Sequence, residues 1–314
     1  MLSELPLQEL KLKEFTVGKK DDGLRVDRFL MNRMPEHSKM FLLKAIKTKK
    51  IRVNGKHPKK DDRVHSGDKV VSYILNEGRK KERTCHFSVV YEDKHVIIVN
   101  KEAGILSEDL TGKTDSTLEN EVNDRLKERG ERARLCHRID YNTSGLVVLA
   151  KNRHSLDVLN RMFKERRVKK TYVCIVSGCP EKKEGRLEHY LTKNARESLV
   201  HVSERPSAAA KTASMEYRVL ASNGKLSLVE CRLETGRTHQ IRCQMAFTGH
   251  PLLGDNKYGK KNLNKEYHEN RQLLCSCRIA FPDVIHDPEL SCLQGKTFQI
   301  KDIAFVNRYF PGCL

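Results

Sequence analysis

The chain begins with a region in which short apolar stripes of helical spacing are set among basic residues. Apolar side chains between residues 26 and 30 predict a first helix, which Pro35 ends. A second helix is expected over residues 38–46, with Ser38 as its N-cap. Both helices have one apolar face, so each must bury that face against another element.

After these helices the spacing changes to the alternation of strands. Residues 51–53 alternate apolar and polar, and they are followed by Asn54-Gly55, a dipeptide typical of hairpin turns. A further strand is expected over residues 70–74. The pattern predicts a small ααβ-type module over residues 15–75, with residues 1–14 as a tail.

The rest of the chain has longer apolar runs and predicts a larger body. Residues 76–86 are polar, charged and aperiodic, which indicates a linker, and the body is expected over residues 87–314. The runs predict two strands within residues 89–101, a helix from Ser116 to Gly130, a strand at 145–150, a helix from Ser155 to Phe163, a strand at 171–177, a hairpin with strands at 215–220 and 226–233, and a helix capped by Thr238. This order predicts an α+β fold with a mixed, mainly antiparallel sheet.

Charge changes this picture, because the chain carries a net +19 at pH 7. The predicted module, residues 15–75, has 16 Lys and Arg against 7 Asp and Glu, and so carries nearly half of that surplus. Such a surplus is typical of proteins that bind a polyanion. Structured RNA, read through its backbone and shape, fits this module. A solvated basic surface without a ligand fits the same composition.

Cysteine usage and hydropathy indicate the compartment. The ten cysteines are scattered, most of them in apolar runs, and no Cys-x-x-Cys pair occurs. We therefore expect reduced thiols and a cytoplasmic protein. The first twelve residues lack the apolar core of a signal peptide, and no apolar run reaches the length of a membrane helix, so no membrane partner is expected.

The most distinctive stretch for chemistry is residues 135–151, where a polar half runs into an apolar strand. It places Asp140 before the turn-forming residues Asn142 to Gly145, in a loop that leads directly into a predicted core strand. Loops braced by a sheet commonly present catalytic groups. An Asp in this context also forms Asx turns and caps, and the residues alone leave both interpretations open.

Other candidate residues have structural alternatives of the same kind. Tyr172 lies in an apolar strand, where a core tyrosine is the ordinary interpretation, and Arg237 lies on a turn before a helix, where most arginines are simply exposed. His137 and His239 could join Asp140 in a metal site. There is no His-x-x-x-His pair and no second nearby carboxylate, so no metal site is expected.

The basic module resembles the RNA-binding domain named after the fourth small-subunit ribosomal protein, here called the S-four domain. The resemblance rests on Leu24-Arg-Val-Asp-Arg-Phe-Leu, Ile51-Arg-Val-Asn-Gly-Lys and Val64-His-Ser-Gly-Asp-Lys-Val. It implies that the module binds RNA. The residues that we expect to contact RNA are Arg28, Lys39, Arg52, Asn54 and Lys56.

The body resembles the RluA-type pseudouridine synthases. The resemblance rests on four runs: Tyr91-Glu-Asp-Lys-His-Val-Ile-Ile-Val-Asn-Lys, His137-Arg-Ile-Asp-Tyr-Asn-Thr-Ser-Gly-Leu, Lys170-Thr-Tyr-Val-Cys-Ile-Val-Ser-Gly, and Glu234-Thr-Gly-Arg-Thr-His-Gln-Ile-Arg with Gly249-His-Pro-Leu-Leu-Gly-Asp-Asn-Lys-Tyr-Gly. It implies an isomerase that converts uridine to pseudouridine in RNA without a cofactor. The order of module and body is similar to that of members that modify large-subunit ribosomal RNA, and we expect a monomer.

This resemblance also implies roles for individual residues. Asp140 is expected to be the essential carboxylate, Tyr172 the aromatic ring against a flipped uracil, and Arg237 the partner of Asp140. Arg138 is expected to enter the RNA stem where the target base has left. Three other hypotheses stay open: a transfer RNA pseudouridine synthase, a non-catalytic RNA-binding or ribosome-assembly protein, and a metal-dependent RNA hydrolase.

Overall fold

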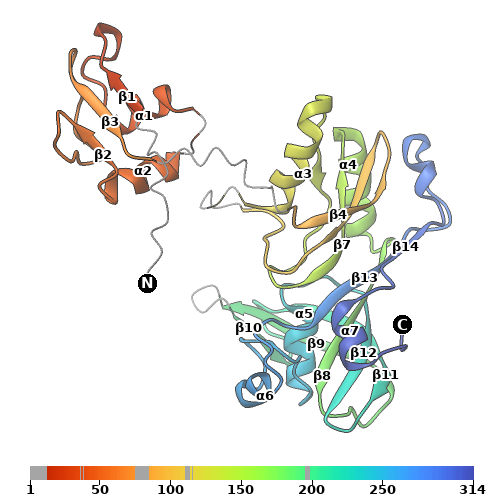
Figure 1. Ribbon diagram of the computed structural model, residues 1–314. Coiled ribbons are helices and arrows are strands. Elements are labelled where there is room, and N and C mark those ends of the chain that lie inside the picture. Colours follow the sequence, from red (N-terminus) through yellow and green to blue (C-terminus); the bar gives the residue numbers. More distant parts are fainter. Residues whose placement is uncertain are drawn as a thin grey trace, which may run out of the picture. The chain divides into compact units, whose positions relative to one another are not determined.

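The computed structural model describes residues 13–35, 37, 39–74, 85–109, 114, 116–194 and 199–314 (Figure 1). The chain divides into two compact units, Met1–Thr84 (unit 1) and Cys85–Leu314 (unit 2). Most of the predicted linker, residues 76–86, and the predicted N-cap Ser38 lie outside the described residues. Within the described ranges, no helix has both the length and the apolar character needed to cross a bilayer.

The described residues of unit 1 form a three-stranded antiparallel sheet with two short α-helices. Its elements are β1 (Lys13–Thr16), a 3-10 turn η1 (Lys19–Asp21), α1 (Val26–Arg33), α2 (Lys39–Lys47), β2 (Ile51–Val53) and β3 (Lys69–Ser72). The strand order is β1-β3-β2. The apolar faces of α1 and α2 bury Phe29, Leu30 and Leu42 against the sheet residues Ile51 and Val70. This burial supplies the core that the helical stripes predicted.

Two local predictions for unit 1 need correction. The predicted tail, residues 1–14, extends too far, because Lys13 and Glu14 belong to β1 and pair with β3. The Asn54-Gly55 turn does form, with hydrogen bonds between the backbones of Val53 and Lys56, but it does not lead directly into a second strand. The ladder partner of β2 is β3, because the chain from residue 57 to residue 68 forms a loop before it returns.

In the described part of unit 2, the strands form one large mixed sheet of eleven strands. The path along the sheet is β10-β9-β11-β12-β8-β13-β7-β5-β4, with β14 beside β13 and β6 beside β7. The strands are β4 (Phe87–Glu92), β5 (Val96–Lys101), β6 (Arg134–Leu135), β7 (Ser144–Ala150), β8 (Lys169–Ser177), β9 (Glu184–Asn194), β10 (Leu199–Ser203), β11 (Lys211–Ser222), β12 (Leu226–Leu233), β13 (Leu274–Ala280) and β14 (Thr297–Gln299). Only the β7–β13 pair is parallel among these described pairings, which confirms the predicted mixed, mainly antiparallel sheet.

Helices cover both faces of this sheet, and strand alternation decides which residues meet them. They are α3 (Leu118–Leu126), η2 (Lys127–Arg129), α4 (Arg153–Lys164), α5 (Gln240–Phe247), α6 (Lys261–Glu266), η3 (Pro288–Leu293) and α7 (Ala304–Tyr309) (Figure 1). Ile97, Val99 and Tyr172 share a core cluster with α3 and α5. The intervening residues Val96 and Ile98 join the cluster of α4.

The helix starts differ from the predicted ones by one or two residues. Thr117, and not Ser116, caps α3 by accepting the N–H of Asn120. The helix predicted to start at Ser155 starts at Arg153, with Asn152 as its cap. The predicted cap Thr238 lies before α5, which starts at Gln240 after a left-handed residue, His239, at φ 54°. In each case several polar residues precede the apolar stripe, so composition alone leaves the start undefined.

Gly145 fixes how β7 lies beside β13. Its φ of +115° is in the range that favours glycine, and a Cβ at this position would collide with the backbone of Ser276. The parallel register pairs Gly145 with Ser276 and Ser144 with Cys275. This close approach holds the start of β7, and therefore the loop before it, firmly against the centre of the sheet.

Candidate active site

A cavity of about 830 Å³ opens on the face of unit 2 that carries α5. It is lined by the loop before β7, by the start of β8 and by the turn that leads into α5. Asp140, Tyr172 and Arg237, three residues singled out from the sequence, all line this one cavity although they lie far apart along the chain. Concave sites with a few convergent polar groups are the usual form of an active site.

The loop that carries Asp140 is held by hydrogen bonds on both sides. Ser107 accepts the backbone N–H of Ile139 and donates its hydroxyl to the Ile139 carbonyl, at 3.2 and 2.9 Å. The carbonyl of Asp140 accepts the N–H of Thr143 at 3.0 Å and so closes the turn. The backbone is therefore fixed, while the Asp140 side chain keeps 26% of its surface exposed at the cavity.

A buried lysine, Lys101, also holds the loop that carries Asp140. Lys101, at the end of β5, is fully buried and donates to the carbonyls of Glu102, Ile105 and Tyr141 at 2.8, 2.9 and 3.2 Å. Burial lowers the pKa of Lys101 to about 8, and the charge of Asp140 opposes this shift. At neutral pH Lys101 remains a cation, and it ties the backbone next to Asp140 to β5.

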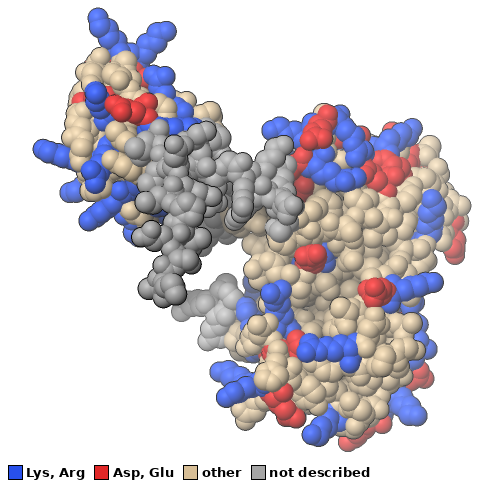
Figure 2. Space-filling model, viewed as in Figure 1, with Lys and Arg blue, Asp and Glu red and all other residues tan. Residues whose placement is uncertain are grey.

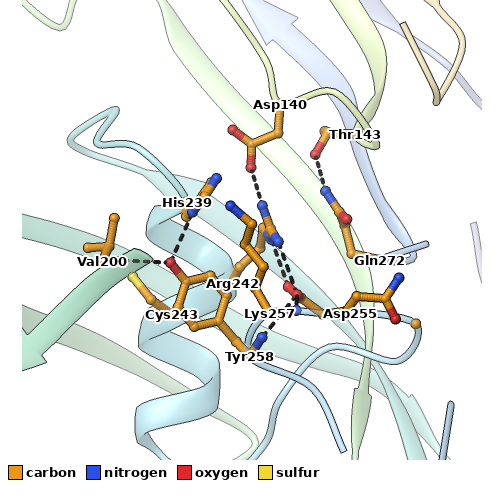
Figure 3. Close-up of polar contacts among 12 residues, drawn as sticks. Asp140, Thr143, Val200, His239, Arg242, Cys243, Asp255, Lys257, Tyr258 and Gln272 are labelled. Atoms are coloured by element: carbon orange, nitrogen blue, oxygen red, sulfur yellow. Dashed lines mark hydrogen bonds and ion pairs between the residues drawn. The ribbon is translucent and has the colours of Figure 1, made fainter. Parts of the chain in front are cut away.

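The partner of Asp140 is Arg242, on α5, and not the predicted Arg237 (Figure 3). The Nη1 of Arg242 donates to Oδ2 of Asp140 at 3.0 Å. The Nε and Nη2 of the same guanidinium donate to the two oxygens of Asp255 at 2.7 and 3.0 Å. This two-pronged geometry orients the guanidinium plane, so that the remaining nitrogen points at Asp140.

Burial and pairing set the ionisation of this cluster. Burial lowers the pKa of Arg242, but its hydrogen bonds and proximity to Asp255 and Asp140 outweigh burial and raise that pKa overall. Burial raises the pKa of Asp255, and the hydrogen bonds from Arg242 outweigh it, so that the pKa ends below its usual value. Both groups are therefore charged at neutral pH, and Asp255 acts as the fixed counter-charge within the protein.

Arg237 lines the cavity without contacting Asp140. Its Nε donates to the carbonyl of Thr212 at 3.1 Å, and its backbone N–H donates to Oε1 of Gln240 at 3.0 Å. The prediction of its partner was wrong because Arg237 lies on the exposed turn before α5, whereas Arg242 lies inside the helix, between the buried residues Ile241 and Cys243. That signal, an arginine flanked by apolar residues, was present in the sequence.

Tyr172 lies on β8 with its ring at the cavity and 6% of its surface exposed. Burial raises the pKa of its hydroxyl above the usual value, and the charge of Asp140 adds to the shift. The hydroxyl is therefore protonated at neutral pH, and the group offers a rigid aromatic face beside a carboxylate.

Arg138, the residue predicted to enter the RNA stem, is more than half exposed and pairs with Glu108 at 2.9 Å. It is held at the mouth of the cavity by an exposed ion pair, which is weak and exchangeable. The position leaves its guanidinium accessible to a ligand.

The two histidines of the metal hypothesis make other contacts. The Nε2 of His137 accepts the N–H of Val148 at 3.2 Å, and burial lowers the pKa of His137 to about 3. The Nδ1 of His239 lies 2.9 Å from the hydroxyl of Tyr258. Among the described residues, no group of three or more His, Cys, Asp and Glu is arranged to hold a metal ion.

The predicted RNA-contacting residues of unit 1 are on its surface, apart from Lys39, whose side chain lies outside the described atoms. Arg28 and Lys56 are exposed, and the guanidinium of Arg52 lies over the ring of Tyr73 at 5.3 Å. The amide of Asn54 bonds to Asp68 and to the backbone of Lys69, so it holds the turn. In the view of Figure 2, Lys and Arg side chains project around the outline of unit 1.

Comparison with known proteins agrees with the fold and the cavity. A model of the family described as RNA pseudouridylate synthase matches residues 95–247. An uncharacterized RNA pseudouridine synthase of Bacillus subtilis, YhcT, is 33% identical over 268 residues, which cover 82% of this chain and 87% of that protein. The ribosomal large subunit pseudouridine synthase C of Buchnera aphidicola is 31% identical and covers 92% of both chains.

A solved structure is similar in fold. Human RNA pseudouridylate synthase domain containing 4 aligns with a TM-score of 0.56 at 23% identity, over 69% of this chain and 89% of that one. The matching family model and these relatives place the chain among the RNA-modifying isomerases. The chain belongs to the RluA family of RNA pseudouridine synthases.

Proposed function

We propose that this pseudouridine synthase modifies uridines in large-subunit ribosomal RNA and that Asp140 is its essential carboxylate. The observation that carries the proposal is the arrangement at the cavity, where Arg242 holds one oxygen of Asp140 and the ring of Tyr172 lies nearby. The name of the Buchnera aphidicola relative, which refers to the ribosomal large subunit, supports the choice of substrate.

The reaction requires a carboxylate close to the ribose. Uracil must be detached from the anomeric carbon, turned and rejoined through its carbon 5. The transition state resembles that of a glycosidase, in which a carboxylate stabilises or attacks the sugar cation. Oδ2 of Asp140 is occupied by Arg242, and Oδ1 has no hydrogen-bond partner among the described residues. We propose that Oδ1 is the oxygen that acts on the substrate.

Arg242 is proposed to hold Asp140 in a fixed position when RNA covers the cavity. Removing water from the site leaves a charged group without solvation, and a fixed guanidinium offsets that cost. Because Asp255 already orients Arg242, little reorganisation is needed during the reaction. Excluding water also prevents a water molecule from attacking the sugar cation before the detached base is rejoined to it.

The target uridine is proposed to leave its stem and stack against Tyr172. Enzymes that act on a base inside paired RNA extrude it, and an aromatic face recovers part of the lost stacking. Arg138, exposed at the cavity mouth, is proposed to occupy the space that the base leaves. Its surface ion pair with Glu108 costs little to break.

Unit 1 is proposed to be an S-four-like RNA-binding domain, which was predicted over residues 15–75 and whose first strand, β1, begins at Lys13. Its exposed basic residues would bind the phosphate backbone of structured RNA and so increase the affinity of the enzyme for RNA, while unit 2 performs the reaction. We propose that the enzyme works as a monomer in the cytoplasm, where its ten free cysteines would stay reduced.

The proposal is tested by tritium release from [5-³H]uridine-labelled ribosomal RNA in the presence of a chelator. Forming the new bond at carbon 5 expels the tritium. Wild type should release it, and Asp140→Asn should not. Asp157→Asn is the matched control, because Asp157 is an exposed carboxylate on α4 in a surface pair with Arg153. Cleavage of the RNA chain that the chelator abolishes, with no release of tritium, would favour the metal-dependent hydrolase instead.

The alternatives predict different outcomes of the same assay. Release from transfer RNA alone would replace the ribosomal substrate while keeping the role of Asp140. Tight binding of either RNA without release by wild type would identify a non-catalytic RNA-binding protein. Equal release by wild type and Asp140→Asn would contradict the role of Asp140.

A further inference from the structure

Lys170 is a cation at the cavity that the proposed reaction does not use. It lies on β8, two residues before Tyr172, and both side chains line the cavity. Residues i and i+2 of a strand face the same side, about 6.6 Å apart along the strand. If a base stacks on Tyr172, Lys170 is therefore about 6.6 Å away along the strand. This distance is similar to the distance between a base and the phosphate of the same nucleotide.

The ammonium of Lys170 has no hydrogen bond and no ion pair among the described residues. Gly236 lies close to this ammonium, since a Cβ at that position would be 3.0 Å from Nζ, and the centroid of the Phe163 ring is 5.9 Å from Nζ. Two other lysines of unit 2, whose side chains are almost fully buried, are paired. Lys101 donates to three carbonyls, and Lys151 pairs with Glu92 and Glu131 at 3.2 and 2.9 Å.

The acidic groups at the cavity are not available to Lys170. Among the described residues, the lining contains two carboxylates, Glu108 and Asp140, and each already has an arginine partner, Arg138 and Arg242. Burial lowers the pKa of Lys170, and no acid contributes to raise it. A partly desolvated cation without a counter-charge is costly, and the cost is relieved when an anion binds.

The turn that faces Lys170 favours an anion as well. Gly236 has no side chain to fill the space above Nζ, and the next residue, Arg237, is an exposed cation at the same cavity. The neighbouring His137 is neutral, because burial lowers its pKa to about 3, so it neither competes for an anion nor repels the lysine.

We propose that Lys170 binds the phosphate of the flipped nucleotide, with Arg237 at the outer side of the same phosphate. This inference rests on the proposed function, because it takes Tyr172 as the ring that meets the uracil. Lys170 positions the nucleotide and does not take part in bond exchange. Its role is to offset the cost of extruding the base with one charge-assisted contact.

The test compares Lys170→Met with Lys170→Arg and with Lys169→Met. Lys169 is the matched control, because it is exposed, neighbours Lys170 on β8 and is not part of the cavity lining. The measurement is kcat/KM for tritium release from labelled large-subunit ribosomal RNA between about 50 and 200 mM salt. Lys170→Met should lower kcat/KM about tenfold at low salt, as expected for loss of a hydrogen bond to a charged group.

The salt dependence separates a phosphate contact from a structural role. In Lys170→Met the plot of log kcat/KM against log salt should become shallower by about one, whereas Lys170→Arg, which keeps the charge, should retain the wild-type slope. The urea midpoint of Lys170→Met should equal or exceed that of wild type, because an unpaired cation is removed. A lower midpoint, an unchanged slope, or the same change of slope in Lys169→Met would overturn the inference.

Failure of this inference differs from failure of the proposed function. If wild type releases tritium and Lys170→Met behaves like wild type, only the phosphate contact is excluded. If wild type releases no tritium from any RNA, the proposed function fails. The same salt series, measured as retention of labelled RNA on filters, then still tests Lys170.

Discussion

The two units of the molecule place their charges in opposite ways. In unit 2 the charges of the cavity are interlocked, with Asp255 bound to Arg242 and Arg242 bound to Asp140. In unit 1 the basic residues proposed to meet RNA, such as Arg28 and Lys56, stand exposed on the surface. Charges that bind one another are fixed in one arrangement, so the effects of substituting them are coupled. Exposed charges contribute to RNA affinity independently, so their effects add.

This difference separates two kinds of contribution to one enzyme. Loss of one interlocked group should disturb its neighbours and reduce turnover, because catalysis depends on groups fixed before the substrate arrives. Loss of one exposed cation should weaken RNA binding slightly and leave turnover unchanged. Substitutions in the two units should therefore fall into two kinetic classes.

A large effect on both turnover and stability is expected for Asp255→Asn, which removes the fixed counter-charge of Arg242. The guanidinium loses its two-pronged partner, so we expect kcat to fall about 100-fold and the free energy of unfolding to fall by about 3 kcal/mol. Urea denaturation and tritium release measure the two effects. The double variant Asp255→Leu with Arg242→Met should regain stability without regaining activity. Recovery of both would show that the pair has only a structural role.

The same pair predicts a dependence of stability on pH. The pKa of Asp255 is lower in the folded protein than its ordinary value, so the pair contributes fully above about pH 4 and the contribution is lost as pH falls through the lowered pKa. The urea midpoints of wild type and Asp255→Asn should therefore converge at acid pH. Parallel curves from pH 7 to pH 2 would contradict this account.

An intermediate effect is expected at Tyr172, where the ring and the hydroxyl can be separated. Tyr172→Phe keeps the aromatic face and should retain activity within about fivefold, whereas Tyr172→Leu should lose about 30-fold through lost stacking. Tritium release at saturating RNA measures both. A Phe variant as inactive as the Leu variant would assign the function to the hydroxyl instead.

The smallest change in turnover is expected in unit 1. The triple variant Arg28→Ala, Arg52→Ala and Lys56→Ala should raise KM about tenfold and leave kcat unchanged. The slope of log binding constant against log salt concentration should become less negative by about two to three. The triple variant Lys182→Ala, Lys183→Ala and Arg205→Ala removes three exposed cations of unit 2 as a control. Equal effects of the two triple variants would remove the distinction between the units.

The general fold was predictable because its signals are local. Stripes of helical spacing and apolar runs indicate helices and buried strands, and β7, β8 and β12 lie at the predicted positions within a few residues. The pairing of β7 with β13 was not predicted, because about 130 residues separate the two strands and no local pattern encodes their register. The β9–β10 pair, Glu184–Asn194 with Leu199–Ser203, was missed because its alternation is weak.

The site was predictable only in part, for a related reason. Asp140 and Tyr172 lie in distinctive runs, and the structure brings both to the cavity. The assignment of Arg237 as the partner of Asp140 was wrong because Arg237 and Arg242 lie only five residues apart in the sequence. The tertiary structure is needed to show that Arg242 is the one that points toward Asp140. Asp255 and Lys101 were overlooked, since a buried charge is recognised by its partners rather than by its neighbours in sequence.

The measurement that tests the central claim most directly compares tritium release by Arg242→Gln and Arg237→Gln under saturating ribosomal RNA. If Arg242 holds Asp140 in its active geometry, Arg242→Gln should lose about 10³-fold in kcat, and Arg237→Gln should change KM with kcat nearly intact. An inactive Arg237→Gln beside an active Arg242→Gln would contradict the account, because the ion pair at 3.0 Å would then have no part in catalysis.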